Sequence, residues 1–300
     1  MSYIRPEHIT EADVSADPRT IMSLLRLVLL ALLMTVGQTP AIAADPVIPY
    51  FWDAKERLAK PDLSTVQRVL FLTTVDFPPF NFLDRTGRLT GFHVDMARAM
   101  CAELGIADRC QIQALPWEEL ETALDRGDGE AIIAGLSVTE ATRQKYAFTR
   151  TYLQFPARFI TPKSTAVTEP LASKLKGQRI GVIQGSAHEA MLREYFPGLK
   201  PVVYTRQDWM LANLKDRKLA AVFGDGMRLG FWLAGSEAAE CCRFSGGPYL
   251  APEYLGSGLS VAATVENAVL TSAFDYALQQ LNAKGVFAEL YLRYFPVSFF

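Results

Sequence analysis

The sequence has little net charge and few residues suited to metal or redox chemistry. Thirty Lys and Arg face 32 Asp and Glu, a formal net charge of -2, which gives no electrostatic case for binding nucleic acid. Its three His and four Cys do not have the spacing of a zinc site. Gly177, Gly181 and Gly185 do not form a phosphate-binding GxGxxG motif. We therefore expect no nucleic-acid partner, no metal and no cofactor.

The sequence also has no apolar run that would comfortably span a membrane. The longest candidate near the start, residues 27–36, is too short and follows Arg26. It is followed by the small-residue sequence Ala-Ile-Ala-Ala at 41–44, which is typical of a cleavage site. We interpret residues 1–44 as a signal peptide that directs the chain to the periplasm. The alternative is an uncleaved anchor.

Export changes the expectation for the cysteines, because exported proteins fold in an oxidising compartment. Cys101 and Cys110 lie at the end of a predicted helix and the start of a predicted strand. We predict a disulfide between them rather than two buried thiols. Cys241 and Cys242 are adjacent, so a bond between them would be strained, and the sequence decides neither state.

The most informative stretch is residues 130–163. A short apolar strand at 131–134 leads into Gly135, and the following loop carries Ser137, Thr139 and Arg143. Glycine lets a ligand approach the backbone, and hydroxyl and guanidinium groups bind carboxylates. This stretch therefore favours a site for a small carboxylate.

The remainder of the chain predicts two α/β series, which indicates two sheets with helices on both faces. We expect two lobes, each with a mixed, mostly parallel sheet. Residues 45–66 form an N-terminal extension, lobe 1 comprises 67–162 plus 250–300, and lobe 2 comprises 163–249. The predicted strands are 68–74, 110–115, 131–134, 155–160, 179–183, 202–204, 219–223 and 258–263, and the predicted helices are 92–104, 117–124, 187–195, 208–215, 227–233, 265–281 and 286–294.

Three polar residues, Ser137, Ser186 and Asp225, fall two or three residues after predicted strands. Ligands of open α/β sheets bind at the carboxyl ends of the strands, and a cleft between lobes is a default small-molecule site. The sequence therefore predicts a ligand site in a cleft between the two lobes.

Seven segments in this order resemble the family 3 periplasmic solute-binding proteins, the amino-acid-type receptors of ABC importers. The resemblance covers about residues 67–296. The segments are FPPFNF at 77–82, TGFHVD at 90–95, GLSVT at 135–139, AFT at 147–149 with Tyr152, LKGQRIGV at 175–182, AAVFGD at 220–225 and YFP at 294–296.

The resemblance implies a clamshell that closes on an amino acid, with site residues from both lobes. In lobe 1, Phe77 resembles the ring that lies over the ligand side chain, and Trp117 lies at a nearby position. Gly135 and Ser137 resemble the lobe 1 donors to the ligand. For each of these side chains the structural alternative is core packing or a turn.

In lobe 2, Ser186 and Ala187 resemble amide donors to a carboxylate at a helix N-terminus, and Asp225 resembles the partner of the ligand ammonium. The structural alternative for Ser186 and Asp225 is helix capping.

The chain departs from the family pattern at the carboxylate-binding arginine. The family has two residues between its Thr and its Arg, whereas three residues separate Thr139 from Arg143. Aligned from Phe148, the arginine position holds Thr142. Either a local shift lets Arg143 reach the cleft, or the carboxylate clamp is weakened.

We therefore predict a non-enzymatic, monomeric binding protein that delivers an amino acid or related carboxylate to an inner-membrane ABC permease. One alternative is an enzyme resembling cyclohexadienyl dehydratase, with Glu130, Glu140 or His188 as the candidate acid. Another is an accessory or sensory protein of an exported redox system.

Overall fold

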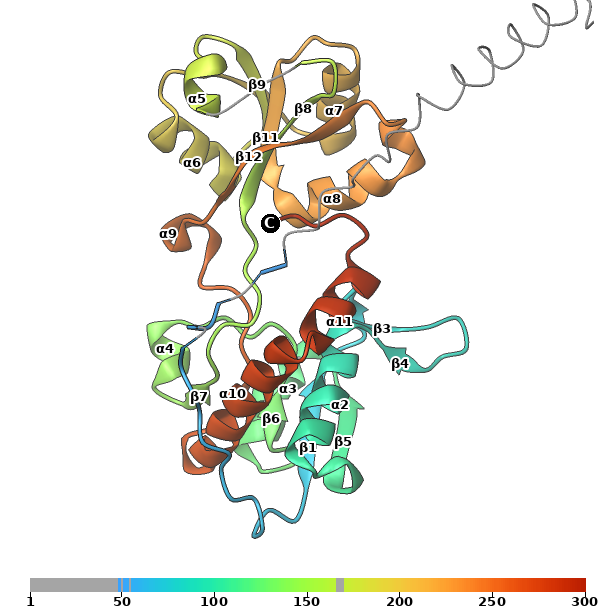
Figure 1. The fold of residues 1–300 in the computed structure, drawn as a ribbon, viewed down its shortest axis with the longest axis vertical. Coiled ribbons are helices and arrows are strands. Elements are labelled where there is room, and N and C mark those ends of the chain that lie inside the picture. Colours follow the sequence, from blue (N-terminus) through green and yellow to red (C-terminus); the bar gives the residue numbers. More distant parts are fainter. Residues whose placement is uncertain (1–47, 50, 54, 166–169) are drawn as a thin grey trace, which may run out of the picture. The chain divides into compact units, whose positions relative to one another are not determined.

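The computed structural model describes residues 48–49, 51–53, 55–165 and 170–300. The predicted signal peptide and the first residues of the extension lie outside this part of the chain. The described residues form two five-stranded sheets and a small three-stranded sheet (Figure 1). We call the part built on the first five-stranded sheet lobe 1 and the part built on the second lobe 2.

The lobe 1 sheet has the order β5-β1-β6-β13-β7. Strand β1 is parallel to β5 and β6, whereas β13 is antiparallel to β6 and β7. All five residues of β1 are buried, as expected for a central strand covered on both faces. The strands are β1 (Val69–Thr73), β5 (Cys110–Ala114), β6 (Ala131–Ile132), β7 (Tyr146–Phe148) and β13 (Ala262–Thr264).

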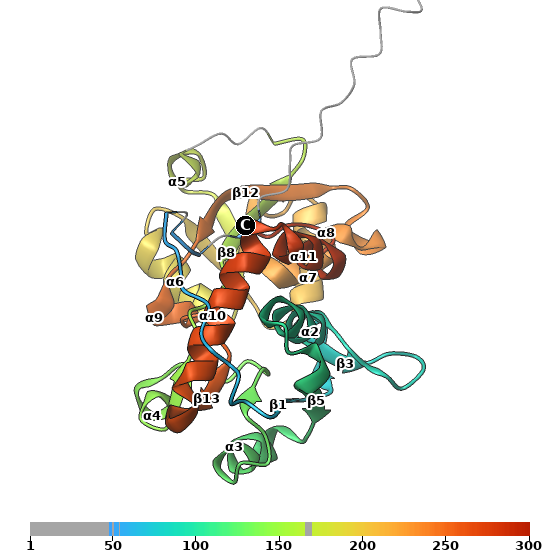
Figure 2. The same cartoon turned by 60° about the horizontal axis from the view of Figure 1, so that its bottom comes forward.

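Four helices of nine or more residues accompany this sheet, and the sequence predicted all of them; the short α4 (Glu140–Arg143), which it did not predict, packs beside β7. Helix α2 ends at Gly105, which adopts the left-handed conformation with a φ of 74° that glycine tolerates at a helix end. The long α10 packs against α2 and α11, and Figure 2 shows it beside β13. The helices are α2 (Phe92–Leu104), α3 (Trp117–Asp125), α10 (Ala268–Ala283) and α11 (Val286–Tyr294).

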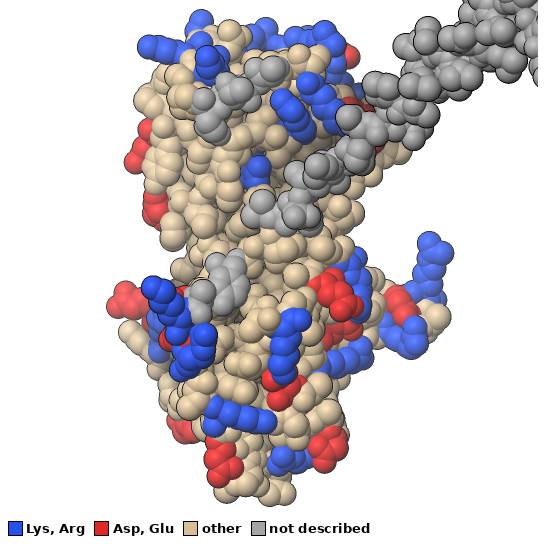
Figure 3. All heavy atoms as spheres, viewed as in Figure 1, with Lys and Arg blue, Asp and Glu red and all other residues tan. Residues whose placement is uncertain are grey.

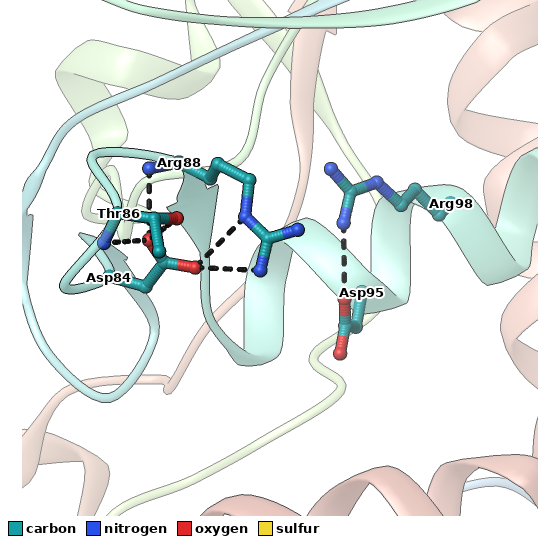
Figure 4. Close-up of polar contacts among 5 residues, drawn as sticks. All are labelled: Asp84, Thr86, Arg88, Asp95 and Arg98. Carbon is teal, nitrogen blue, oxygen red and sulfur yellow. Dashed lines mark hydrogen bonds and ion pairs between the residues drawn. The ribbon is translucent and has the colours of Figure 1, made fainter.

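A small sheet that the sequence did not predict follows β1. Strands β2 (Asp76–Phe77), β3 (Asn81–Leu83) and β4 (Leu89–Thr90) pair antiparallel. The β3–β4 turn is held by Asp84, which accepts hydrogen bonds from Thr86 and Arg88 (Figure 4). The Thr86 hydroxyl and the Arg88 backbone N–H keep the pKa of Asp84 well below its usual range. The sequence predicted no strand at residues 75–91, but cross-strand pairing orders this region into three strands.

The lobe 2 sheet has the order β10-β9-β11-β8-β12; β9 is parallel to β10 and β11, and β8 is antiparallel to both of its neighbours, β11 and β12. Its strands are β8 (Ala157–Pro162), β9 (Arg179–Ile183), β10 (Lys200–Tyr204), β11 (Ala221–Asp225) and β12 (Cys242–Tyr249). Its helices are α5 (Leu171–Lys174), α6 (Ala187–Tyr195), α7 (Gln207–Lys215) and α8 (Gly226–Ala234), and the short α9 (Pro252–Leu255), which we assigned to lobe 1, packs against α6 in the lobe 2 core.

Two segments of this sheet differ from the sequence expectation. We assigned residues 157–162 to lobe 1, but β8 pairs with β11 and β12 and so belongs to the lobe 2 sheet. The sequence predicted no strand at residues 242–249, but they form β12, which bonds to β8 along most of its length. Partner choice between strands depends on long-range packing, which a local sequence pattern does not encode.

The described part of the N-terminal extension packs on lobe 1. Trp52 and Leu63 are buried in its core, and Gln279 of α10 exchanges hydrogen bonds with the backbone at Glu56 and Leu58. The extension therefore belongs to the lobe 1 core.

Both cysteine pairs are bonded. Cys101 of α2 is joined to Cys110 of β5, which confirms the predicted disulfide. Cys241 and Cys242, which the sequence left undecided, are joined to each other at the start of β12. The first bond ties a helix to the edge strand of its own sheet.

Candidate ligand site

In lobe 2, two predicted ligand residues cap the helices that follow β9 and β11. The Ser186 hydroxyl accepts a hydrogen bond from the Glu189 N–H at 3.1 Å, at the start of α6. Asp225 Oδ1 accepts one from the Arg228 N–H at 2.7 Å, at the start of α8. Both residues therefore act as helix caps, which was their structural alternative. The second Asp225 oxygen has no recorded partner among the described residues and remains available for a ligand.

Ser186 and Asp225 also line one cavity, of about 100 Å³, at the carboxyl ends of β9 and β11. Residues from the first turns of three helices line it: His188 of α6, Gln207 of α7 and Arg228 of α8. Helix N-termini present free N–H groups and positive dipole ends, which favour an anion. The cavity therefore combines anion-binding geometry with one carboxylate, a combination that suits a zwitterion.

His188 is the most informative member of this cavity. Its Nε2 is shielded from solvent and has no hydrogen-bond partner within the described chain. Burial lowers the pKa of His188, opposed by the nearby Asp225 carboxylate and assisted by Arg228. A neutral imidazole with an unused nitrogen can donate or accept one hydrogen bond to a ligand. The sequence named His188 only as a candidate acid and did not place it with the other cavity residues, because the cavity is formed by three separate helices.

In lobe 1, Phe77 and Gly135 lie in contact distance of each other. A Cβ added to Gly135 would lie 3.3 Å from Phe77 Cε1. The Phe77 ring stacks on Phe80, with centroids 4.6 Å apart and planes 27° apart. Gly135 has a φ of 88°, which side chains rarely adopt. The structure therefore brings the predicted ring and the predicted backbone donor together.

Trp117 does not pack into the core, which was its structural alternative. It is 48 % exposed at the start of α3. With Thr74, Val75 and Asp76 it lines a surface cavity of about 260 Å³ at the end of β1. An exposed indole beside an acidic residue is free to contact a ligand. Asp76 is a lobe 1 carboxylate that the sequence reasoning did not single out.

Thr142, which occupies the family's arginine position, is engaged by its own loop. Its hydroxyl donates to the Ser137 carbonyl at 2.8 Å, and it forms a reciprocal capping box with Thr139 at the start of α4 (Glu140–Arg143). Arg143 is exposed, and no hydrogen bond or ion pair of its guanidinium is recorded among the described residues. Ser137 is exposed too, and Ala187 is the first residue of α6.

A buried chain of hydrogen bonds lies behind Phe77. The Asn81 amide donates to the Thr74 hydroxyl at 2.7 Å, and its carbonyl accepts from His93 Nδ1 at 2.9 Å. His93 Nε2 accepts from the Tyr152 hydroxyl at 2.9 Å. Burial lowers the pKa of His93 to about 3, which keeps the ring neutral. The chain fixes the residues that flank the Phe77 loop, and it confirms a structural role for His93.

The other two acid candidates do not line the cavity that His188 lines. Glu130 accepts the Leu70 N–H at 2.6 Å and pairs with Arg68 at 2.7 Å, at the amino end of β1. Glu140 lies in the first turn of the short α4 and is exposed. Of the three candidates named from the sequence, only His188 faces a cavity with other site residues.

The described residues contain no group of three or more His, Cys, Asp or Glu side chains placed to hold a metal. Over the same residues, no helix combines the length and apolarity of a membrane span.

The chain belongs to the bacterial extracellular solute-binding proteins, family 3, whose model matches residues 69–297. A lysine/arginine/ornithine-binding periplasmic protein of Escherichia coli is 28% identical over 228 residues, which cover 75% of this chain and 86% of that protein. A histidine-binding periplasmic protein of Salmonella typhimurium is 28% identical over 232 residues, 76% of this chain and 88% of that protein.

Solved structures confirm the fold. The L-cystine solute receptor of Neisseria gonorrhoeae, in its unliganded open conformation, has a TM-score of 0.65 at 18% identity, covering 77% of this chain and 94% of that one. The second substrate binding domain of a putative amino acid ABC transporter from Streptococcus pneumoniae has a TM-score of 0.62 at 22% identity, covering 76% of this chain and all of that one. The protein is thus a two-lobed solute-binding protein, as its sequence indicated.

Proposed function

We propose that this protein binds a small amino acid or related carboxylate between its two lobes and delivers it to an inner-membrane ABC permease. The observation that carries the proposal is the lobe 2 cavity, where Asp225 and the first turns of α6, α7 and α8 converge. The relatives named for lysine, arginine, ornithine and histidine support an amino acid as the ligand class.

The roles follow from charge and geometry. The amides of Ser186, whose N–H donates to the Ile183 carbonyl at 3.3 Å in this structure, and of Ala187 take the carboxylate, and Asp225 takes the ammonium group. Arg143, whose guanidinium has no recorded partner in the described chain, supplies a cation from lobe 1. Phe77 and Trp117 contact the ligand side chain, and Gly135 and Ser137 donate from the loop after β6. Ligand contacts to both lobes then favour closure by their differential free energy.

We infer a periplasmic location and a monomeric state, with residues 1–44 removed on export. The relatives carry the names of binding proteins, which supports binding and delivery over turnover. The engagement of Glu130 with the Leu70 N–H and Arg68 at the amino end of β1 also weighs against it as a catalytic acid.

The test is calorimetric titration of protein purified from the periplasm of expressing cells, whose N-terminal sequence also reports the cleavage site. The panel contains the proteinogenic amino acids, ornithine and a set of organic acids. Asp225→Ala and Arg143→Ala are titrated alongside the parent protein.

Binding of an amino acid that weakens at least about tenfold in both variants supports the proposed zwitterion site. Loss in Arg143→Ala alone points to an organic acid without an amine. Binding that survives both substitutions contradicts the assigned residues. Turnover of prephenate or arogenate would favour the enzymatic alternative.

A further inference from the structure

Lobe 2 carries a second cavity that the proposed ligand site does not use. It has a volume of about 640 Å³ and is formed by the end of β8, the end of α5, the start of β9 and the turn between α7 and β11. Arg179 is the first residue of β9, whereas Ser186 follows its last residue. Each residue of a strand advances the chain by about 3.3 Å, so the length of β9 separates the two sites. They lie at opposite ends of the strands.

The side chains around this cavity are strongly cationic. Lys174, Arg179, Arg217 and Lys218 line it, together with the hydroxyl-bearing Ser164 and Thr165. Among the described lining residues there is no Asp or Glu. Lys218 pairs with Asp216 at 2.9 Å, but the other three cations have no recorded side-chain partner in the described chain. Unpaired cations that converge from three segments repel one another unless an anion binds between them.

The surrounding lobe strengthens the field. The described residues of 157–249 carry 13 Lys and Arg against seven Asp and Glu, whereas residues 69–156 and 250–300 carry ten against 16. In Figure 3, Lys and Arg spheres gather at the end of lobe 2 where Figure 1 draws α5. The near-neutral total charge therefore conceals a basic lobe 2 and an acidic lobe 1.

Arg217 gives an independent reason to assign a role to this cluster. It follows α7 in the left-handed conformation, with a φ of 60°, and its N–H caps the Leu214 carbonyl. Glycine is the usual residue at this position, because a Cβ strains the backbone there. Arg217 adopts this strained backbone conformation, and its guanidinium lies beside the cavity.

We propose that this cavity is a binding site for a phosphate group. A tetrahedral oxyanion offers acceptor oxygens in several directions, which suits donors from three segments, and guanidinium groups bind phosphate in bidentate fashion. The phosphate comes either from a free phosphate ion or from an anionic phospholipid headgroup, and both sources share this chemistry. Binding is independent of the amino-acid site, because the two sites lie at opposite ends of the strands.

Two probes distinguish the sources: inorganic pyrophosphate, followed by calorimetry, and vesicles of phosphatidylglycerol in phosphatidylcholine, followed by co-sedimentation. The test variant is the double substitution Arg179→Gln with Arg217→Gln. Its control is Arg193→Gln with Arg206→Gln, which makes the same charge change in lobe 2 at arginines already paired with Glu189 and Asp208. Arg217→Gly is a third variant, which removes the guanidinium and relieves the backbone strain.

We expect saturable binding of at least one probe, about tenfold weaker in the test variant and nearly unchanged in the control. Arg217→Gly should also bind more weakly, while its melting temperature rises. Binding of pyrophosphate alone identifies a free anion, and binding of vesicles identifies the headgroup. If both double variants bind the probe equally weakly, the attraction comes from the overall charge of lobe 2 and the proposal is wrong. It is also wrong if neither probe binds.

Discussion

Phe77 is the last residue of β2 and Gly135 lies in the loop after β6, yet a Cβ on Gly135 would lie only 3.3 Å from the Phe77 ring. We therefore expect Gly135→Ala to push the ring out of its stack on Phe80 and to weaken ligand binding about tenfold, as calorimetry would measure. The matched control is Gly127→Ala, which shares a positive φ of 74° but has no atom within 4 Å of its Cβ.

Both glycine variants should lose about 1 kcal/mol of unfolding free energy to backbone strain. Only Gly135→Ala should lose affinity. Equal ligand affinities in the two variants would show that Phe77 is not part of the ligand site.

Replacing His188 should change binding without harming the fold. His188→Leu removes a shielded nitrogen that has no partner in the described chain, so we expect the free energy of unfolding to stay constant or rise by about 1 kcal/mol. Ligand affinity should fall about tenfold, because the ligand loses a hydrogen bond inside the cavity. His188→Gln should retain more affinity than His188→Leu. Reduced stability with unchanged affinity would mean that His188 only packs.

His93 should make the fold sensitive to acid. The pKa of His93 is about 3 in the folded protein, against about 6.5 for an unperturbed His. Between these values the unfolded chain binds a proton that the native state rejects, so stability falls as pH falls through this window. The loss of unfolding free energy that His93 causes reaches about 1.4 kcal/mol for each pH unit that the pH falls, and it vanishes above about pH 6.5.

The measurement is chemical denaturation from pH 7 to pH 4 for the parent and His93→Gln. The variant should be less stable at pH 7, because the bond to Tyr152 is altered, but its stability should depend less on pH. Parallel pH profiles would contradict the assignment of a neutral, buried ring.

The two disulfides should differ in their contribution to stability. Cys101→Ser with Cys110→Ser opens a closed loop and should lower the free energy of unfolding by about 2–3 kcal/mol. Cys241→Ser with Cys242→Ser should cost less, because adjacent residues enclose almost no chain. Thermal unfolding of both double variants compares them directly. A larger loss from the adjacent pair would show that its bond organises the start of β12.

Much of the fold was readable from the sequence because its main signals are local. Helix α2 combines apolar periodicity with the stop signal at Gly105, and β1 is a continuous apolar run. The small sheet of β2, β3 and β4 escaped prediction because prolines and glycines describe its turns but not its pairing. The partners of β8 and β12 escaped for a related reason, since sheet membership depends on contacts distant in sequence.

By itself, the sequence determined the two-lobed α/β class and the positions of Ser186 and Asp225 at the ends of their strands. Local residue patterns mark strand ends and helix caps, so neighbouring residues suffice to predict them. It did not determine which side chains meet. The tertiary structure placed His188, Gln207 and Arg228 around one cavity, engaged Thr142 within its loop and left the Arg143 guanidinium exposed. Those relationships arise from elements far apart in the chain, and only packing brings them into contact.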